Sequence, residues 1–244
     1  MFKTIICFLL VLAGLLLFPF AFISGFFYFI GLRKLTKLCI YRLAQGWAKV
    51  MILAVGCKMI VKGRENIPAK GGVCFVSNHC GYFDIILALS YCKRPFGFIA
   101  KKELLFLPFF NLWIFMLGGL FIDRKNNRKA INTINKGVER IKNGACMIIF
   151  PEGHRSKGRG LLPFHPGSLR LATKADAPII PVAISGSYEI FERQNYVVAG
   201  EVRISFLEPI ETANLSPEEK KQALCDRIYS AISAELSEKE QSHD

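Results

Sequence analysis

Acidic side chains are scarce through most of this sequence. Residues 1–184 contain 7 Asp and Glu against 26 Lys and Arg, whereas residues 185–244 contain 12 against 6. The whole chain carries a formal net charge of +13, and such a field favours anionic partners: nucleic acid, anionic lipid or phosphorylated substrates. Zinc-finger spacings, RNA-binding aromatic signatures and basic DNA-binding helices are missing. Because 52% of the residues are hydrophobic, we expect membrane lipid as the partner and no nucleic acid.

The sequence also lacks the cysteine and histidine patterns of several other classes. None of the eight cysteines forms a Cys-x-x-Cys pair, and most lie in apolar runs, which indicates buried free thiols in a reducing compartment. The four histidines are scattered without metal-ligand spacing, so we expect no metal site. Cys80 follows His79 directly, but adjacent side chains usually diverge, which argues against a Cys–His nucleophile. A hydrolase would need a nucleophile near His79, and no Gly-x-Ser-x-Gly elbow is present.

Charge is absent from residues 5–32. This run of 28 residues exceeds the roughly 20 that span a bilayer, and it is too long for the apolar core of a signal peptide. Gly14, Pro19 and Gly25 can kink it, which leaves both a transmembrane span and a monotopic helix open. Five basic residues follow between positions 33 and 49, and by the positive-inside rule they lie on the cytoplasmic face.

Residues 34–55 have the pattern of an amphipathic helix. Lys34, Lys37, Arg42, Gln45 and Lys49 form its polar side, and Leu35, Leu38, Leu43, Trp47 and Val50 occupy much of the remainder. Such a helix either lies in the headgroup plane or packs on a protein core with one face solvated. We predict membrane-associated helices over residues 1–56 and an α/β domain over residues 57–244.

From residue 57 onwards, apolar runs alternate with helical patterns. Strands are predicted at 58–62, 73–77, 96–100, 119–122, 146–150, 179–184 and 201–206, and helices near 84–92, 103–117, 126–142, 168–175 and 217–236. The last helix opens with a capping box, Ser216 to Glu219, with Pro217 at its first position. The alternation predicts a mixed, partly parallel sheet flanked by helices and preceded by the N-terminal anchoring segment.

The stretch from Ser77 to Asp84 joins a predicted strand to a predicted helix. His79 falls on the turn, and Asp84 falls where a helix N-cap belongs. The turn can fold Asp84 back onto the imidazole, which fixes the tautomer and frees the other nitrogen as a base. A loop histidine beside a helix cap is the alternative interpretation.

Other charged residues also follow predicted strands. Lys101, Arg124, Glu152 and Arg155 each come shortly after a strand, as His79 does. Ligands of open α/β sheets bind outside the carboxyl ends of the strands, so these side chains are expected to meet in one cleft. Two arginines near a lysine suit a phosphate group.

Four motifs follow one another in the sequence: Asn78-His79 with Asp84, Gly118 with Phe121-Ile122-Asp123-Arg124, Phe150-Pro151-Glu152-Gly153-His154-Arg155-Ser156, and Ile180-Pro181-Val182-Ala183-Ile184. In this order they resemble the motifs of the 1-acylglycerol-3-phosphate acyltransferase family of glycerolipid enzymes. The resemblance covers about residues 55–210. The chain departs from the family at His154, where Thr is usual, and at His165-Pro166-Gly167, where the family often has Lys before the Gly.

The resemblance implies an acyltransferase of phospholipid biosynthesis that makes phosphatidic acid. His79 would be the general base on the sn-2 hydroxyl of a lysophospholipid acceptor, and Asp84 would orient it. Lys101, Arg124 and Arg155 would hold the acceptor phosphate, and Glu152 with Gly153 would position the acceptor or its loop. Acyl-CoA or acyl carrier protein would be the donor, backbone N–H groups would form an oxyanion hole, and neither a cofactor nor a metal is needed.

Two points stay open in the sequence. The acceptor can be another lysolipid, such as a lyso-ornithine lipid, and a non-catalytic lipid-binding protein is the competing class, although binding alone needs no base–orienter pair. The apolar run 104–120 is either the wall of an acyl-chain tunnel or a crossover helix buried on all sides, and we expect the buried helix.

Overall fold

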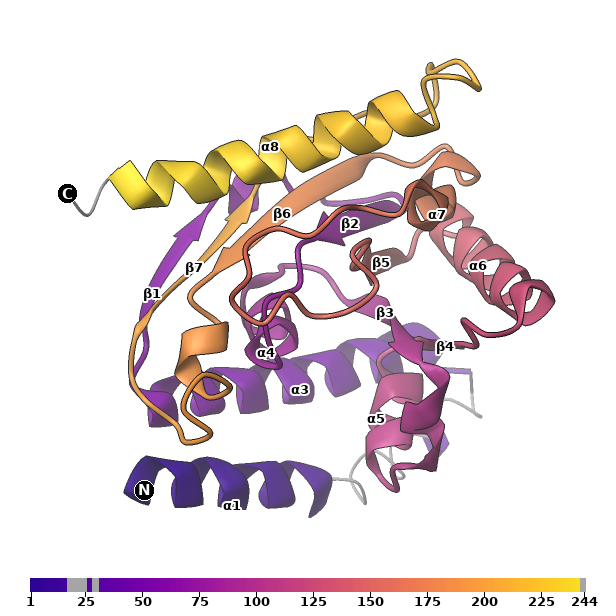
Figure 1. Ribbon diagram of the computed structural model, residues 1–244. Coiled ribbons are helices and arrows are strands. Elements are labelled where there is room, and N and C mark those ends of the chain that lie inside the picture. Colours follow the sequence, from indigo (N-terminus) through magenta and orange to yellow (C-terminus); the bar gives the residue numbers. More distant parts are fainter. Residues whose placement is uncertain (17–25, 28–30, 242–244) are drawn as a thin grey trace.

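A seven-stranded sheet lies between two layers of helices in the computed structural model, which describes residues 1–16, 26–27 and 31–241 (Figure 1). The strands are β1 (Lys58–Lys62), β2 (Val73–Ser77), β3 (Phe96–Lys101), β4 (Leu120–Ile122), β5 (Cys146–Ile149), β6 (Ile179–Ser185) and β7 (Glu201–Phe206). The α-helices are α1 (Phe2–Leu16), α3 (Arg33–Val55), α4 (Phe83–Tyr91), α5 (Phe110–Met116), α6 (Asn127–Lys142), α7 (Arg170–Thr173) and α8 (Gln222–Gln241). Short 3-10 turns are η1 (Arg64–Asn66), η2 (Lys102–Phe106), η3 (Pro166–Leu169) and η4 (Tyr188–Ile190).

The sheet is mixed and mostly parallel, which confirms the predicted fold class. Its strand order is β1-β7-β6-β2-β5-β3-β4. The five strands from β6 to β4 run parallel, whereas β7 pairs antiparallel with β6 and carries β1 parallel to itself. The carboxyl ends of five strands therefore meet at one edge.

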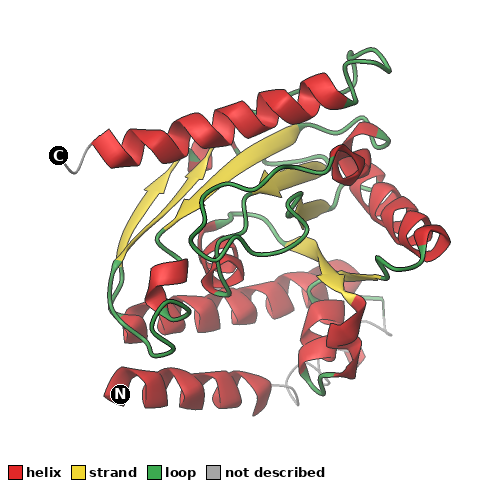
Figure 2. Cartoon of the chain, viewed as in Figure 1, coloured by secondary structure: helices red, strands yellow, loops and turns green. Residues whose placement is uncertain are grey.

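The middle of the sheet is buried on both faces, as a parallel sheet requires. All five residues of β2 are buried. Successive side chains point to opposite faces, so Phe75 joins the core beneath α3 and α4 while Cys74 joins the core beneath α6 and α8. Figure 2 shows the same arrangement, with α8 on one side of the strands and α1 and α3 on the other.

Helix α3 packs on the domain core through one face. Within it, the Gln45 side chain is buried and donates to the carbonyls of Leu89 at 3.2 Å and Cys92 at 3.0 Å, so its expected place on the polar side is wrong. Trp47 donates its indole N–H to the carbonyl of Leu10 in α1 at 2.9 Å. Within the described residues, Leu35–Val55 is long and apolar enough to cross a membrane, with 44% of it buried. Most of residues 5–32 after Leu16 lies outside the described residues, and the domain boundary at residue 56 stays a prediction.

The expected helix over 103–117 is interrupted. It forms η2 and then the short α5, and the break falls at Pro108, which has no N–H, and Phe109, whose φ is 62°. The expectation that this run is buried on all sides is wrong, because Ile114 is the one buried residue of α5.

Near the C-terminus the capping box forms, with the Ser216 N–H donating to Glu219 at 2.7 Å and the Glu219 N–H to Ser216 at 3.2 Å. Residues 217–221 form turns, however, and α8 begins at Gln222 rather than near residue 217.

Candidate active site

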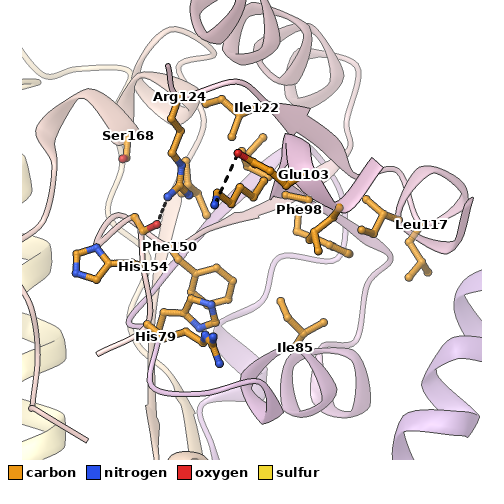
Figure 3. A pocket seen from close by; sticks show the side chains of 18 of the residues that line it. His79, Ile85, Phe98, Glu103, Leu117, Ile122, Arg124, Phe150, His154 and Ser168 are labelled. Carbon is orange, nitrogen blue, oxygen red and sulfur yellow. Dashed lines mark hydrogen bonds and ion pairs between the residues drawn. The ribbon is translucent and has the colours of Figure 1, made fainter. Parts of the chain in front are cut away.

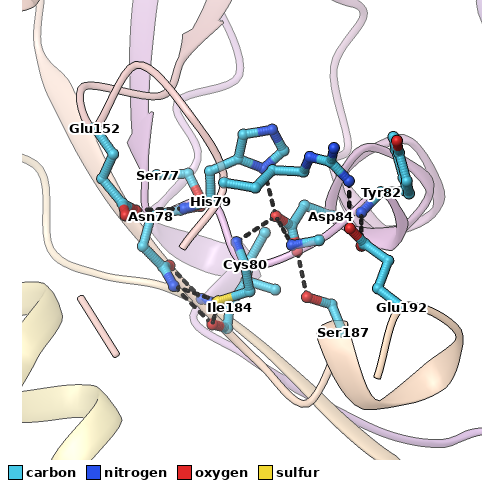
Figure 4. Close-up of polar contacts among 12 residues, drawn as sticks. Ser77, Asn78, His79, Cys80, Tyr82, Asp84, Glu152, Ile184, Ser187 and Glu192 are labelled. Carbon is cyan, nitrogen blue, oxygen red and sulfur yellow. Dashed lines mark hydrogen bonds and ion pairs between the residues drawn. The ribbon is translucent and has the colours of Figure 1, made fainter. Parts of the chain in front are cut away.

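His79 and Asp84 are brought together at the carboxyl end of β2. The His79 Nδ1 lies 2.6 Å from Asp84 Oδ2 (Figure 4). The sequence pattern placed Asp84 at the N-cap of α4. That prediction is wrong, because Tyr82 takes that position. Its fully buried carboxylate folds back onto the preceding loop and accepts the N–H groups of Cys80 at 2.7 Å and Gly81 at 3.0 Å.

This geometry sets the tautomer of the imidazole. Oδ2 of Asp84 acts as the acceptor for both backbone N–H groups and faces the ring with the same oxygen, so His79 donates from Nδ1 and keeps a lone pair on Nε2. The ring stacks on Phe150 at 4.2 Å between centroids and an interplanar angle of 22°. The His79 side chain is 20% exposed and lines a cavity of about 1620 Å³ (Figure 3). Its free nitrogen is therefore available as a base.

The loop after β5 fixes the backbone on both sides of His79. The Ser156 N–H donates to the His79 carbonyl at 2.8 Å, and the Lys157 N–H donates to the Cys80 carbonyl at 3.2 Å. Glu152 is 1% exposed and accepts the His79 N–H at 2.6 Å and the Leu162 N–H at 3.2 Å. Glu152 is not among the residues that line the cavity; it holds the loop that carries His79 in place.

Burial raises the pKa of Glu152 from 4.5 to about 7, because desolvation outweighs the two N–H groups that favour the carboxylate. The folded state thus holds this proton more tightly than the unfolded chain. The free energy of unfolding of the wild type, compared with that of a Glu152→Gln variant, is therefore expected to fall as the pH rises from about 4.5 to about 7. The total loss is up to about 3 kcal/mol, and above that range the difference stays constant. Denaturant unfolding across that range measures the slope. Glu139→Gln, on the exposed side of α6, is the matched control and should remove none of it.

The surroundings of Asn78 and Cys80 indicate structural rather than catalytic roles. The Asn78 side chain accepts the Ile184 N–H and donates to the Ile184 carbonyl, both at 2.8 Å, which extends the pairing of β2 with β6. Burial, with Asp84 and Glu152 nearby, raises the pKa of Cys80 to about 12. The thiol stays protonated at neutral pH and is no nucleophile.

The cavity is lined by two unlike groups of side chains; in Figure 3, Ile85, Phe98 and Leu117 lie to one side of Arg124 and His154. We call one the apolar lobe, lined by Ile85, Phe98, Leu104, Trp113 and Leu117. We call the other the cationic lobe, lined by Arg124, Lys157, Arg159, Arg170 and Lys174. Glu103 is the one acidic side chain among the described residues of the cavity wall. A ligand with an apolar chain and an anionic end fits this division.

The three predicted phosphate-binding residues differ in the protein contacts that their charged groups already make. Arg124 reaches over the loop after β5 and donates to the carbonyl of Gly153, whose own backbone lines the cavity. Arg155 pairs with Glu192 and lies 3.6 Å over the Tyr82 ring, so part of its guanidinium is occupied. Lys101 sits on the cavity wall with a 62% exposed side chain, 3.7 Å from Glu103. Of these three cations, Arg124 is the one whose partner is a neutral carbonyl rather than a carboxylate, so its charge is not balanced by that contact.

Sequence reasoning missed Ser187 and Glu192. Ser187 is 1% exposed and donates its hydroxyl to Oδ1 of Asp84, opposite the oxygen that faces His79. Glu192 accepts the Tyr82 N–H at 2.5 Å and holds Arg155. Ser187 follows β6 as the other site residues follow their strands, so its place at a strand end was a usable signal. No local motif points to Glu192.

Replacing Ser187 with Ala is expected to lower stability and, more modestly than loss of the base, kcat. A hydrogen bond to a charged group is worth roughly 1.5–3 kcal/mol, and Asp84 keeps three other donors. The acceptor KM should not change, because Ser187 does not line the cavity. Denaturant unfolding and steady-state kinetics measure both effects, with Ser185→Ala as the control. A variant as stable and as active as wild type would contradict the role.

The chain belongs to the acyltransferase family, whose family model matches residues 58–185. That span contains His79, Asp84 and the loop after β5 that bonds to the His79 backbone.

Individual relatives and a solved structure support the same family assignment. The 1-acyl-sn-glycerol-3-phosphate acyltransferase of Escherichia coli is 34% identical over 74% of this chain and 75% of that protein. The human 1-acyl-sn-glycerol-3-phosphate acyltransferase alpha is 30% identical over 71% of this chain and 62% of that protein. The crystal structure of the 1-acyl-sn-glycerophosphate acyltransferase PlsC from Thermotoga maritima superposes with a TM-score of 0.78 at 28% identity and covers 98% of both chains.

Proposed function

We propose that this enzyme transfers an acyl group from an acyl thioester to the sn-2 hydroxyl of 1-acyl-glycerol-3-phosphate, giving phosphatidic acid. The observation that carries the proposal is the place of His79: an imidazole oriented by a buried carboxylate, between an apolar and a cationic lobe of one cavity. The names of the relatives describe this reaction, and the four motifs lie in the part of the chain that the family model matches.

The proposed reaction proceeds without a covalent enzyme intermediate. Nε2 of His79 takes the proton of the sn-2 hydroxyl as its oxygen attacks the thioester carbonyl carbon, and Asp84 stabilises the imidazolium that forms. The tetrahedral intermediate then collapses, the C–S bond breaks, and the imidazolium returns its proton to the thiolate. Backbone N–H groups that stabilise the oxyanion stay a prediction.

The two lobes divide the substrates. Acyl chains fit the apolar lobe, and the acceptor phosphate fits beside Arg124, where a guanidinium offers forked donors. Lys101 and Arg155 are proposed to add positive charge at the rim. The remaining cations of the cationic lobe exceed what one phosphate needs, so they suit the phosphates of the donor, which acyl-CoA and the phosphopantetheine arm of acyl carrier protein share.

The enzyme is proposed to work at the membrane with its α/β domain on the cytoplasmic face. The exposed apolar side of α1, including Phe8 at 61% and Leu9 at 56%, and the basic residues of α3 support this placement. Full-length protein should sediment with membranes after a high-salt wash. Complete solubility at both low and high salt would contradict the placement.

An acceptor panel tests the function directly. Purified enzyme is assayed with lysophosphatidic acid, lysophosphatidylcholine, lysophosphatidylethanolamine and a lyso-ornithine lipid, each with acyl-CoA and with acyl carrier protein as donor. We expect lysophosphatidic acid to give the highest kcat/KM. Preference for a lysolipid without a phosphate would overturn the acceptor assignment, and no turnover with any pair would overturn the reaction.

A further inference from the structure

His165 lines the cavity in the stretch where the sequence departs from the family pattern. Its side chain is exposed, and its imidazole forms no hydrogen bond or ion pair within the described part of the chain. Two of the predicted phosphate-binding cations differ from it in this respect, because Lys101 lies 3.7 Å from Glu103 and Arg155 pairs with Glu192. The imidazole is therefore available to a ligand in the cavity.

Arg124 and His165 are held against the same short stretch of backbone. Arg124 donates from Nη1 to the carbonyl of Gly153, and the His165 N–H donates to the carbonyl of Pro151 at 3.0 Å. The point that a Cβ on Gly153 would occupy lies 3.5 Å from Nη1 of Arg124 and 3.7 Å from Nε2 of His165. Because Gly153 has no side chain, the guanidinium and the imidazole border one open point on the cavity wall.

A phosphate monoester suits two donors arranged in this way. It presents three strong acceptor oxygens, which form their best hydrogen bonds with charged donors. Nη1 of Arg124 is shared with the Gly153 carbonyl, so Arg124 alone leaves part of a phosphate without a donor. The Nε2–H of a protonated His165 supplies a second charged donor beside it.

The charge of this pair depends on pH, because histidine changes its charge between pH 5 and 8 whereas arginine stays protonated. The cations that share this wall come from the end of β4, the loop after β5 and α7, and they are Arg124, His154, Lys157, Arg159, Arg170 and Lys174.

The acidic groups nearby do not neutralise the ring of His165. Glu103 acts on Arg124, and the Glu152 carboxylate is turned to the N–H groups of His79 and Leu162. A bound phosphate therefore favours the protonated ring, and by reciprocity the protonated ring favours the phosphate.

We propose that His165 is a second ligand of the acceptor phosphate, beside Arg124, and that its protonated ring binds the acceptor more tightly than its neutral ring. The inference deepens the proposed function, since it rests on a lysophospholipid phosphate as the ligand of this cavity. It makes the affinity for the acceptor depend on pH separately from the base chemistry of His79.

Equilibrium binding in the absence of a donor tests the proposal. Isothermal titration of lysophosphatidic acid in detergent micelles into the full-length enzyme measures Kd at about pH 5 and about pH 8, the two ends of the histidine range. Wild type should match His165→Lys at the lower pH and His165→Gln at the higher. At the lower pH it should bind about five- to tenfold more tightly than His165→Gln, because charge-assisted hydrogen bonds are about twice as strong as neutral ones.

Comparing the proteins at one pH cancels the titrations that they share. The second ionisation of the phosphate, near pH 6, and the proton of Glu152 affect all three proteins alike. Ser230→Lys places a permanent cation on an exposed position of α8 and should follow wild type at both pH values. Equal affinities of wild type and His165→Gln at about pH 5, or a gain in Ser230→Lys as large as that in His165→Lys at about pH 8, would overturn the proposal.

The binding assay separates this proposal from the reaction. An enzyme that binds lysophosphatidic acid with the expected pattern and does not acylate it would count against the proposed function, with the second phosphate ligand unaffected. An enzyme that acylates lysophosphatidic acid while the His165 variants bind it as wild type does at both pH values would overturn the second ligand and leave the reaction in place.

Discussion

Replacing His79 with Ala should reduce kcat by about 10²–10⁴, the range that general-base assistance supplies. The reason is the placement of its Nε2, since Nδ1 is held by Asp84 at 2.6 Å while the ring faces the cavity. Loss of the imidazole leaves the acceptor hydroxyl, a poor nucleophile at neutral pH, without a base. Steady-state kinetics with both substrates measure the loss, and matched circular dichroism shows that the fold is kept.

Two variants beside His79 separate its chemistry from its surroundings. Asp84→Asn can place its amide oxygen where Oδ2 accepts the N–H groups of Cys80 and Gly81, and its NH₂ can donate to Ser187. The loop is then kept while the charge that stabilises imidazolium is lost, so kcat should fall strongly with little change in acceptor KM. Cys80→Ala should stay near wild type. A folded His79→Ala enzyme within tenfold of wild type, or an inactive Cys80→Ala enzyme, would sink the general-base mechanism.

Replacing Arg124 with Ala should lower kcat/KM for the acceptor by about 10- to 150-fold, which corresponds to the roughly 1.5–3 kcal/mol of a charge-assisted hydrogen bond. Arg124 lines the cavity at the start of the cationic lobe, where the acceptor phosphate is proposed to bind. The acceptor KM should rise, and the donor KM should change little. Initial rates with each substrate varied in turn measure the difference.

Neighbouring cations provide the controls. Lys125→Ala removes a charge from the next residue, which is exposed and does not line the cavity, so its kinetics should match wild type. Arg155→Ala should cost less than Arg124→Ala in acceptor binding, because Arg155 is held by Glu192 and Tyr82. Wild-type acceptor kinetics in both Arg124→Ala and Arg155→Ala would place the phosphate elsewhere.

The sequence predicts the sheet and the pairing of His79 with Asp84 because both depend on local patterns. Strand β2 is a continuous apolar run, and the turn from Ser77 to Asp84 follows it directly, so the meeting of His79 with Asp84 needs only a few residues of chain. The convergence of Lys101, Arg124 and Arg155 needs the strands to be parallel, which the alternation of strands with helices predicted correctly.

What the sequence does not reveal depends on distant contacts. Glu152 looks like any loop carboxylate until the fold buries it against the His79 N–H, 73 residues away in the chain. Gln45 has the pattern of a solvent-facing residue in the sequence, but in the fold it donates to the carbonyl of Cys92 at the end of α4. The apolar run at 104–117 carries the composition of a buried helix, and composition does not show that the folded segment leaves Phe106 and Phe115 exposed.

The clamp between the loops after β2 and β5 has a consequence for motion. Because the amides of Ser156 and Lys157 bond to the carbonyls of His79 and Cys80, neither loop can open alone without losing the bonds of both. The two loops should therefore open as one cooperative unit, and hydrogen exchange should protect the amides of His79, Ser156 and Lys157 to a similar degree. The edge of the sheet that carries His79 is then either fully formed or fully open, and no state keeps one of the two loops in place while the other is open.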